Sequence, residues 1–182
     1  MNIPNTPILK NRVKGFTIVE LLVVIVVIGI LAAITMVAYN SAQARTRDSV
    51  RMHDLGVIKD ALKLHSTYKN SWVEAGSGCG YNGDGGGWFS YTNGSTYTKS
   101  ISNCLVEAGY LNYDIADPTG GKTSSPTSGY SYMKYHCGSG SSLRVFLYAK
   151  LETQPQDSTA TDGTCSSTLD TSYGMNYYIQ VK

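Results

Sequence analysis

The most informative part of this sequence is KGFTIVELLVVIVVIGILAAI, residues 14–34. It opens an apolar run, residues 16–38, in which Glu20 is the single charged side chain. At 1.5 Å per residue, a helix over that run is about 34 Å long, which is enough to cross a hydrocarbon core of roughly 30 Å. Valine and isoleucine lower its intrinsic helix propensity, but in lipid the backbone must satisfy its own hydrogen bonds. The run therefore predicts a membrane-spanning helix.

The predicted helix continues beyond the apolar run. Between residues 40 and 69 there is no proline, and Gly56 is the only glycine. Apolar residues fall mainly on one side of this second part, and charged residues occupy much of the rest. The apolar set is Val50, Val57, Ile58, Ala61, Leu62, Leu64 and Tyr68, and the charged set is Arg47, Arg51, Asp54, Lys59 and Lys63. We predict one helix over residues 16–69, about 80 Å long, apolar all round at first and amphipathic afterwards.

After residue 69 the composition turns to glycine, serine, threonine, tyrosine and asparagine. Turn residues and alternation predict a long irregular loop, a short helical turn and three strands. In chain order these are residues 76–98, 103–110, 130–136, 143–151 and 173–181. In the second strand, Leu143, Val145, Leu147 and Ala149 alternate with Arg144, Phe146, Tyr148 and Lys150. A small antiparallel sheet whose apolar face covers the amphipathic half of the helix makes the predicted fold class α+β.

Four cysteines lie in the C-terminal two thirds of the chain: Cys79, Cys104, Cys137 and Cys165. An even number at wide spacing, without a C-x-x-C pair, predicts two disulfides in preference to a metal site. Disulfides imply that this part lies outside the cytoplasm. Of the three possible pairings we favour neighbours, Cys79 with Cys104 and Cys137 with Cys165, each closing a loop of about 25–30 residues. The sequence leaves the other two pairings open.

Charge and motifs give little support for nucleic-acid binding or catalysis. The chain has 15 Lys and Arg and 13 Asp and Glu; leaving out the three cations of residues 1–15 and the single acid Glu20 gives 12 of each. The rest of the chain is therefore neutral, and a neutral domain has no general reason to hold phosphate backbones. The run ADPTGGKT, residues 116–123, is close to a phosphate-binding loop but has Ala116 for its first glycine and contains Pro118. We interpret it as a turn, and expect no enzymatic activity and no cofactor.

The junction at Gly15 resembles the prepilin signature of type IV pilins and type II secretion pseudopilins. The shared features are a basic leader with Lys10, Arg12 and Lys14, then Gly15, Phe16, Glu20 and an unbroken apolar helix. In that family a membrane peptidase cuts after the glycine and methylates the new N-terminus. The resemblance therefore implies cleavage between Gly15 and Phe16, N-methylation of Phe16 and an assembly role for Glu20. It also implies a leader over residues 1–15, a long helix over residues 16–69 and a disulfide-bound globular head over residues 70–182.

Physical reasoning agrees with this resemblance. An ordinary secretory signal is cut after its apolar segment, whereas a cut after Gly15 leaves that segment on the mature chain. A carboxylate such as Glu20 inside a membrane segment is costly and usually has a partner, which the Phe16 amine of a neighbouring subunit would supply. One departure is that many pilins carry a proline near the position of Val37, where this chain has Thr35, Met36 and Val37.

The resemblance implies a structural subunit that polymerises into a type IV pilus or a pilus-like filament serving adhesion, motility or DNA uptake. Its partners would be copies of itself, a prepilin peptidase and the assembly machinery. It would cross the cytoplasmic membrane once before assembly, with its head outside the cytoplasm, and then enter an extracellular filament. Three alternatives remain: a pseudopilin of a type II secretion system, a binding domain released by signal peptidase near Ala44, and an uncut membrane-anchored receptor.

Two weaker site patterns occur in the C-terminal part. Asp157, Asp162 and Asp170 are candidate calcium ligands, although their spacing does not match an EF-hand loop. The tripeptide at Asn93 is a formal acceptor for N-glycosylation.

Overall fold

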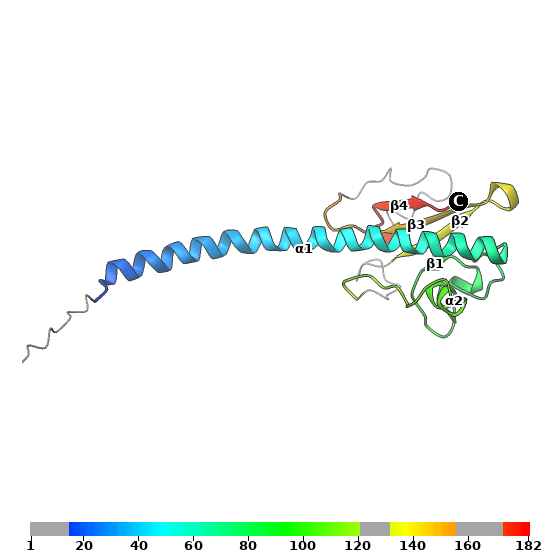
Figure 1. The fold of residues 1–182 in the computed structure, drawn as a ribbon, viewed down its shortest axis with the longest axis horizontal. Helices are drawn as coiled ribbons and strands as arrows, with labels where there is room; N and C mark the ends of the chain where they lie inside the picture. The colour runs from blue at the N-terminus through cyan, green and yellow to red at the C-terminus, as the bar shows by residue number, and fades with distance from the viewer. Residues whose placement is uncertain (1–14, 121–131, 156–172) are drawn as a thin grey trace, which may run out of the picture. The chain divides into compact units, whose positions relative to one another are not determined.

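The computed structural model describes residues 15–120, 132–155 and 173–182 of the 182-residue chain. Its elements follow one another in the order α1, η1, β1, α2, β2, η2, β3 and β4 (Figure 1). Their bounds are α1 Ile18–Lys69, the 3-10 turn η1 Tyr81–Gly83, β1 Gly87–Trp88, α2 Ile101–Glu107, β2 Met133–Cys137, the 3-10 turn η2 Gly140–Ser142, β3 Arg144–Ala149 and β4 Tyr177–Gln180. The chain divides into two compact units, Met1–Asn40 and Ser41–Lys182. We call the second one the head unit.

Helix α1 confirms the predicted long helix. It starts two residues after the expected position and ends at Lys69, as expected. By length and composition it is apolar enough in its first part to cross a membrane. Every residue from 15 to 43 is exposed in the isolated chain.

Four antiparallel strands form one sheet in the order β1-β2-β3-β4, so the predicted α+β class is confirmed. The strands β2, β3 and β4 lie within one to four residues of the predicted ends. Strand β1 was missed, because it contains two residues inside a segment predicted to be an irregular loop. It pairs with β2 through Gly87 opposite Lys134 and Trp88 opposite Met133. A two-residue strand is too short for alternation to indicate it.

Strand β3 is buried on both of its faces from Val145 to Ala149. On one face, Val145 and Leu147 of β3 pack in a cluster with Leu55, Ile58 and Leu62 of α1, and Figure 1 shows this part of α1 running beside the sheet. The other face carries a second cluster, whose buried members are Trp88, Tyr97, Met133, Phe146, Tyr148 and Met175. Alternate residues of β3 therefore point to opposite faces of the strand, as predicted, and both faces are buried. Burial of each large side chain contributes about 1.5–3 kcal/mol to stability.

The buried side of α1 differs from the predicted stripe. Val50, Leu64 and Tyr68 were expected to be buried, but they are 40%, 47% and 74% exposed. Arg51 was assigned to the charged face, yet it is fully buried, and Asp48 is buried beside it. The reason is that acidic groups from distant loops surround Arg51, and this cannot be inferred from helical periodicity. Leu55, Ile58, Ala61 and Leu62 supply the apolar part of the buried side.

Helix α2 confirms the predicted helical turn and begins two residues earlier. Its N-cap is Ser100, whose hydroxyl accepts a hydrogen bond of 2.9 Å from the backbone N–H of Asn103. Cys104 of α2 forms a disulfide with Cys79, with the two Cα atoms 6.4 Å apart. This confirms the first predicted pair. Cys137 is also disulfide-bonded, but Cys165 lies outside the described residues, so the second pairing stays a prediction.

Candidate functional site

The N-terminus of α1 is closed by a reciprocal capping box. The Glu20 carboxylate accepts hydrogen bonds from the backbone N–H and the hydroxyl of Thr17, both at 2.8 Å through the same oxygen, Oε2. In return, the Thr17 hydroxyl accepts a hydrogen bond of 3.3 Å from the backbone N–H of Glu20. This arrangement satisfies two backbone donors that a helix start otherwise leaves open. The sequence carries its signature, Thr-x-x-Glu before an apolar run, which was not among the predicted features.

The second oxygen of the Glu20 carboxylate, Oε1, receives no hydrogen bond from the part of the chain that the structure describes. An ionised carboxylate accepts about four hydrogen bonds over its two oxygens. The capping box therefore uses only some of the hydrogen bonds that the Glu20 carboxylate can accept. The same side chain can close its own helix and still bind a positively charged group of another molecule.

The apolar surface that follows the cap is long and uninterrupted. Phe16 and Ile18 are 83% and 84% exposed, and the large apolar residues between Leu21 and Leu31 are 48–63% exposed. A continuous exposed apolar surface on a protein indicates contact with a membrane or with other protein. The structure thus brings together the predicted junction residues Gly15 and Phe16, the carboxylate of Glu20 and this surface.

The helix is unbroken where many pilins carry a proline. Here Thr35 occupies that region, and its hydroxyl donates to the carbonyl oxygens of Leu31 and Ala32, at 2.8 and 3.0 Å. A threonine bonded back in this way keeps its polar group satisfied inside an apolar segment. The backbone hydrogen bonds of α1 continue on both sides of it.

A buried charge network joins α1 to two loops of the head unit. The Arg51 guanidinium donates to both oxygens of Asp117, at 2.7 and 3.1 Å, and to Asp48 and Glu152, at 2.8 and 2.7 Å. Arg47 adds two more hydrogen bonds to Glu152, at 2.7 and 2.5 Å. Such forked pairs fix geometry as well as charge. The sequence shows only the Asp48–Arg51 spacing, because the other acids lie 66 and 101 positions away.

The pKa values of three members of the network shift toward their charged forms. Although burial opposes its ionisation, backbone N–H groups of Glu152 and Thr153 lower the pKa of Asp48. Hydrogen bonds from Arg47 lower the pKa of Glu152, and the surrounding acids raise the pKa of Arg51 against the effect of burial. Nothing in this arrangement leaves a group free for proton transfer. The network holds the loops that contain Asp117 and Glu152 against the part of α1 that belongs to the head unit.

The run of residues 116–123, which is close to a phosphate-binding loop in sequence, contains the predicted turn. The backbone N–H of Gly120 donates to the carbonyl oxygen of Asp117 at 2.8 Å, and the Asp117 carboxylate accepts from the N–H of Thr119 at 2.9 Å. The Asp117 carboxylate also accepts hydrogen bonds from Arg51. Groups of the protein itself therefore occupy the hydrogen-bonding positions of this carboxylate. Residues 121–123 lie outside the described part.

The weaker site predictions remain open. Asp157, Asp162 and Asp170 lie outside the described residues, and within residues 15–120, 132–155 and 173–182 no group of three His, Cys, Asp or Glu is placed to hold a metal ion. Asn93 is exposed, and its side-chain oxygen accepts hydrogen bonds from the backbone N–H groups of Ser95 and Tyr97, at 3.0 and 2.8 Å. The glycosylation acceptor therefore also stabilises a turn.

The start of the chain matches one family model, the prokaryotic N-terminal methylation motif, over residues 10–36. That span contains the junction, the capping box and most of the exposed apolar surface.

Similar proteins extend the comparison into the head unit. The chain is 32% identical to the fimbrial protein EcpC of Eikenella corrodens over 115 residues, which cover 63% of this chain and 74% of that relative. It is 51% identical to the type IV major fimbrial protein FimA of Dichelobacter nodosus over 56 residues, or 31% of this chain and 32% of FimA. It is 31% identical to the type IV major pilin protein PilA of Myxococcus xanthus over 80 residues, or 44% of this chain and 36% of PilA. No solved structure matches it significantly.

Proposed function

Because this chain belongs to the type IV pilin family, it is a structural subunit of a pilus, and we propose that its mature form begins at Phe16 and polymerises through residues 16–38. The observation that carries this proposal is the exposed apolar surface of α1, which starts at the junction and which no described residue covers. In the membrane, lipid covers that surface. In a filament, the same helices of other subunits take the place of lipid.

Glu20 has a defined part in this proposal. After cleavage the new N-terminus is an amine on Phe16, and one oxygen of a neighbouring subunit's Glu20 remains available to accept from it. Opposite charges in a water-poor environment attract strongly once each has its hydrogen-bond partner. The pair would align adjacent subunits, because only one register along the helices brings the amine to the carboxylate.

The rest of the chain is assigned in keeping with this scheme. Residues 1–15 serve as the leader, a prepilin peptidase cuts and methylates the chain, and assembly machinery extracts it from the cytoplasmic membrane. The globular head over residues 70–182 stays outside the cytoplasm and then on the filament surface, where its disulfide is stable. The chain itself carries out no catalysis.

The alternatives receive less support. The relatives are named as fimbrial and pilin proteins, which favours a pilus over a secretion pseudopilus. Release near Ala44 would discard the segment that matches the family model. An uncut receptor would leave the junction at Gly15 without a purpose.

The N-terminus of the mature protein tests the proposal directly. Intact mass and N-terminal peptide mass spectrometry of protein from the producing cells should give a chain that begins at N-methylated Phe16. A Gly15→Leu variant, which places a bulky side chain at the cut, should retain its leader and accumulate in the membrane. A start at Arg45 would contradict the proposal, and a start at Met1 would favour the uncut anchor.

A further inference from the structure

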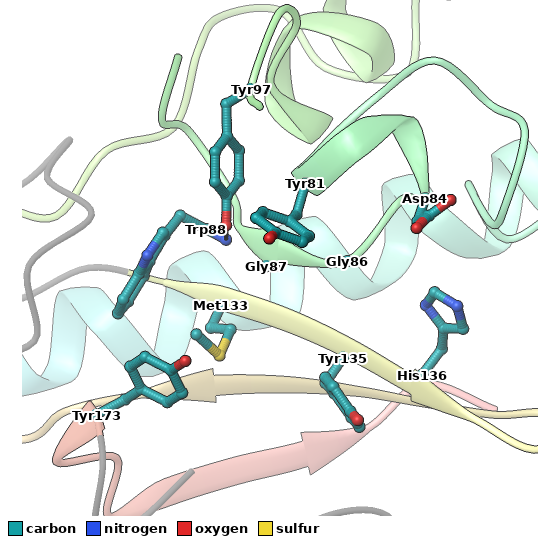
Figure 2. Close-up of a pocket in the computed structure, with 10 residues that line it drawn as sticks. All are labelled: Tyr81, Asp84, Gly86, Gly87, Trp88, Tyr97, Met133, Tyr135, His136 and Tyr173. Atoms are coloured by element: carbon teal, nitrogen blue, oxygen red, sulfur yellow. Dashed lines mark hydrogen bonds between the residues drawn. The ribbon is translucent and has the colours of Figure 1, made fainter. Parts of the chain in front are cut away.

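The head unit contains a pocket of about 610 Å³, whose lining residues lie outside the apolar surface of residues 16–38 (Figure 2). It opens between β2 and the segment that carries η1 and β1. Five aromatic side chains line it: Tyr81, Trp88, Tyr97, Tyr135 and Tyr173. Cavities of this volume with an apolar and aromatic lining are typical of small-molecule sites.

The rings enclose the pocket from several directions. Tyr81 and Tyr97 meet edge to face with centroids 5.5 Å apart, and Trp88 and Tyr173 meet in the same way at 5.5 Å and 88°. Figure 2 shows the first pair above the strand and Trp88 and Tyr173 together at one end. Rings set at steep angles form walls that surround a guest. A single flat platform for stacking would need parallel rings.

The pocket has a preformed geometry. The Tyr97 hydroxyl accepts a hydrogen bond of 3.3 Å from the backbone N–H of Trp88, which fixes one ring against another. Gly87 has φ +87°, and a Cβ atom there would lie 2.3 Å from the Tyr97 hydroxyl oxygen. The disulfide at Cys79 holds the start of this loop on α2. Ligand binding therefore requires little further ordering of the pocket, so the entropic cost of binding is small.

The formal charge at the pocket is negative. Among the described residues that line it, only Asp84, which is exposed, carries a formal charge, and no described side chain donates a hydrogen bond to that carboxylate. His136 lies beside Asp84 at the other end of the pocket in Figure 2. Burial, with a smaller effect of Lys134, lowers the pKa of His136, so the imidazole is neutral at pH 7. Lys134 is fully buried and donates to two backbone carbonyls, and the charge of Glu74 partly offsets the lowering of its pKa by burial.

We propose that this pocket binds an organic cation with a methylated or quaternary ammonium group, which the aromatic rings surround and the Asp84 carboxylate neutralises. The negative faces of aromatic rings attract such cations, and each added methyl group removes an N–H donor, so that a quaternary ammonium group needs no hydrogen-bond acceptor. Metal ions prefer several oxygen ligands, whereas this pocket offers one carboxylate among rings. The volume exceeds that of an ammonium group alone, so the ligand extends beyond its cationic end.

The test compares a cation with a neutral molecule of the same shape. Choline and 3,3-dimethylbutan-1-ol differ by a charged nitrogen in place of a carbon. The full mature chain is kept in a polyoxyethylene detergent, which contains neither choline nor sugar. Trp72→Phe leaves Trp88 as the only tryptophan, so its fluorescence reports on the pocket. Choline should give a saturable change, and the neutral alcohol should bind at least about tenfold more weakly.

Two pairs of variants locate the site. Asp84→Asn should weaken choline binding about tenfold and leave the response to the alcohol unchanged, while Asp60→Asn removes the same charge from an exposed position and should change neither. Tyr81→Leu should weaken choline binding, while Tyr113→Leu alters a tyrosine that does not line the pocket and should not. The urea midpoint of each variant shows that it is folded.

Three outcomes would overturn the proposal. Equal affinity for choline and the alcohol would indicate an apolar cavity without charge recognition. Saturable binding of a neutral monosaccharide without a response to choline would assign the pocket to sugars. Unchanged choline affinity in both Asp84→Asn and Tyr81→Leu would place the binding elsewhere. None of these results depends on filament formation, because the chain is monomeric or micelle-bound throughout.

Discussion

The Glu20 carboxylate combines a local role and an intermolecular one, and substitutions can separate them. Glutamine keeps an oxygen for the capping box but loses the charge, whereas alanine loses both. We expect Glu20→Gln and Glu20→Ala to be processed and inserted normally, and both to give only a small fraction of normal filament, because an uncharged residue cannot compensate a neighbour's amine. Immunoblots of membranes and of sheared filaments measure the two quantities.

A threonine variant supplies the control for Glu20. Thr17→Val removes the hydroxyl of the capping box and keeps the carboxylate, so filament yield should remain close to normal. If Glu20→Gln gave normal filaments while Thr17→Val did not, the carboxylate would matter for the helix start alone.

Lys134 is a buried cation whose role is structural. Its ammonium donates to the carbonyl oxygens of Val73 and Gly85, both at 2.8 Å. It thereby holds the loop after α1, where Val73 adopts a φ of +57° that β-branched residues rarely accept. A lysine on the helix-facing side of β2 could not have been identified as a loop anchor from its sequence position.

The pKa of Lys134 predicts how stability depends on pH. Burial lowers this pKa to about 7, against about 10.4 in an unfolded chain. Between these values the unfolded chain binds more protons than the folded one, so stability rises with pH. We expect about 1 kcal/mol per pH unit between pH 7 and 9.5 from this group. Above that range Tyr97 and Tyr132, whose pKa values burial raises, act in the opposite direction.

Urea unfolding of the mature chain in nonionic detergent, followed by tryptophan fluorescence, measures this slope. Lys134→Met should destabilise the head unit by about 2–4 kcal/mol because two buried carbonyls lose their donor. It should also flatten the dependence on pH. An unchanged slope in Lys134→Met would assign the titration to other groups.

At the scale of elements, the Arg51 network decides how firmly α1 is held by the loops of the head unit. Arg51→Met leaves Asp48, Asp117 and Glu152 close together without their common cation. Breaking a buried pair in this way costs about 3–5 kcal/mol. Arg45→Met is the matched control, since Arg45 is exposed six positions earlier on the same helix and should shift the urea midpoint little. Equal shifts for both variants would show that the network adds no stability.

The elements of this fold differ in how far they could be predicted. Helix α1 was clear because a long apolar run and a long amphipathic pattern each repeat many times. The strands β2 to β4 were found by alternation, whereas β1 was too short. Burial of Arg51 depends on acids more than 60 residues away, and the pocket on rings from four separate segments. Such sites arise from long-range contacts that no local pattern records.

At the scale of the molecule, the two compact units should behave differently when separated. A chain that begins at Ala44 retains nearly the whole head unit and lacks the exposed apolar surface of residues 16–38. It should be soluble and monomeric, whereas the full mature chain should require detergent or a filament. Sedimentation velocity of both forms measures this. Stable oligomers of the shorter chain would show that the head unit drives assembly.

The truncated chain also tests the receptor alternative. If the chain is a pilus subunit, removing residues 16–43 abolishes incorporation into filaments while choline binding by the head unit is retained. A protein that remained active in its cellular role without this segment would be an anchored receptor.

The capping box also determines whether the bond between Gly15 and Phe16 lies inside or outside the helix, which matters for a protease. It sets the start of α1 at Ile18, so that residues 15–17 lie outside the helix and Thr17 contributes only its carbonyl oxygen, which accepts a hydrogen bond of 3.2 Å from the backbone N–H of Leu21. Proteases bind their substrates in extended form, and a scissile bond inside a helix would first have to be unwound at the membrane. Because Thr17 and Glu20 cap the helix two residues beyond the bond, the proposed cleavage site lies outside the helix, and no helical turn has to be unwound there. In this proposal, the side chain that joins subunits also keeps the bond after Gly15 outside the helix.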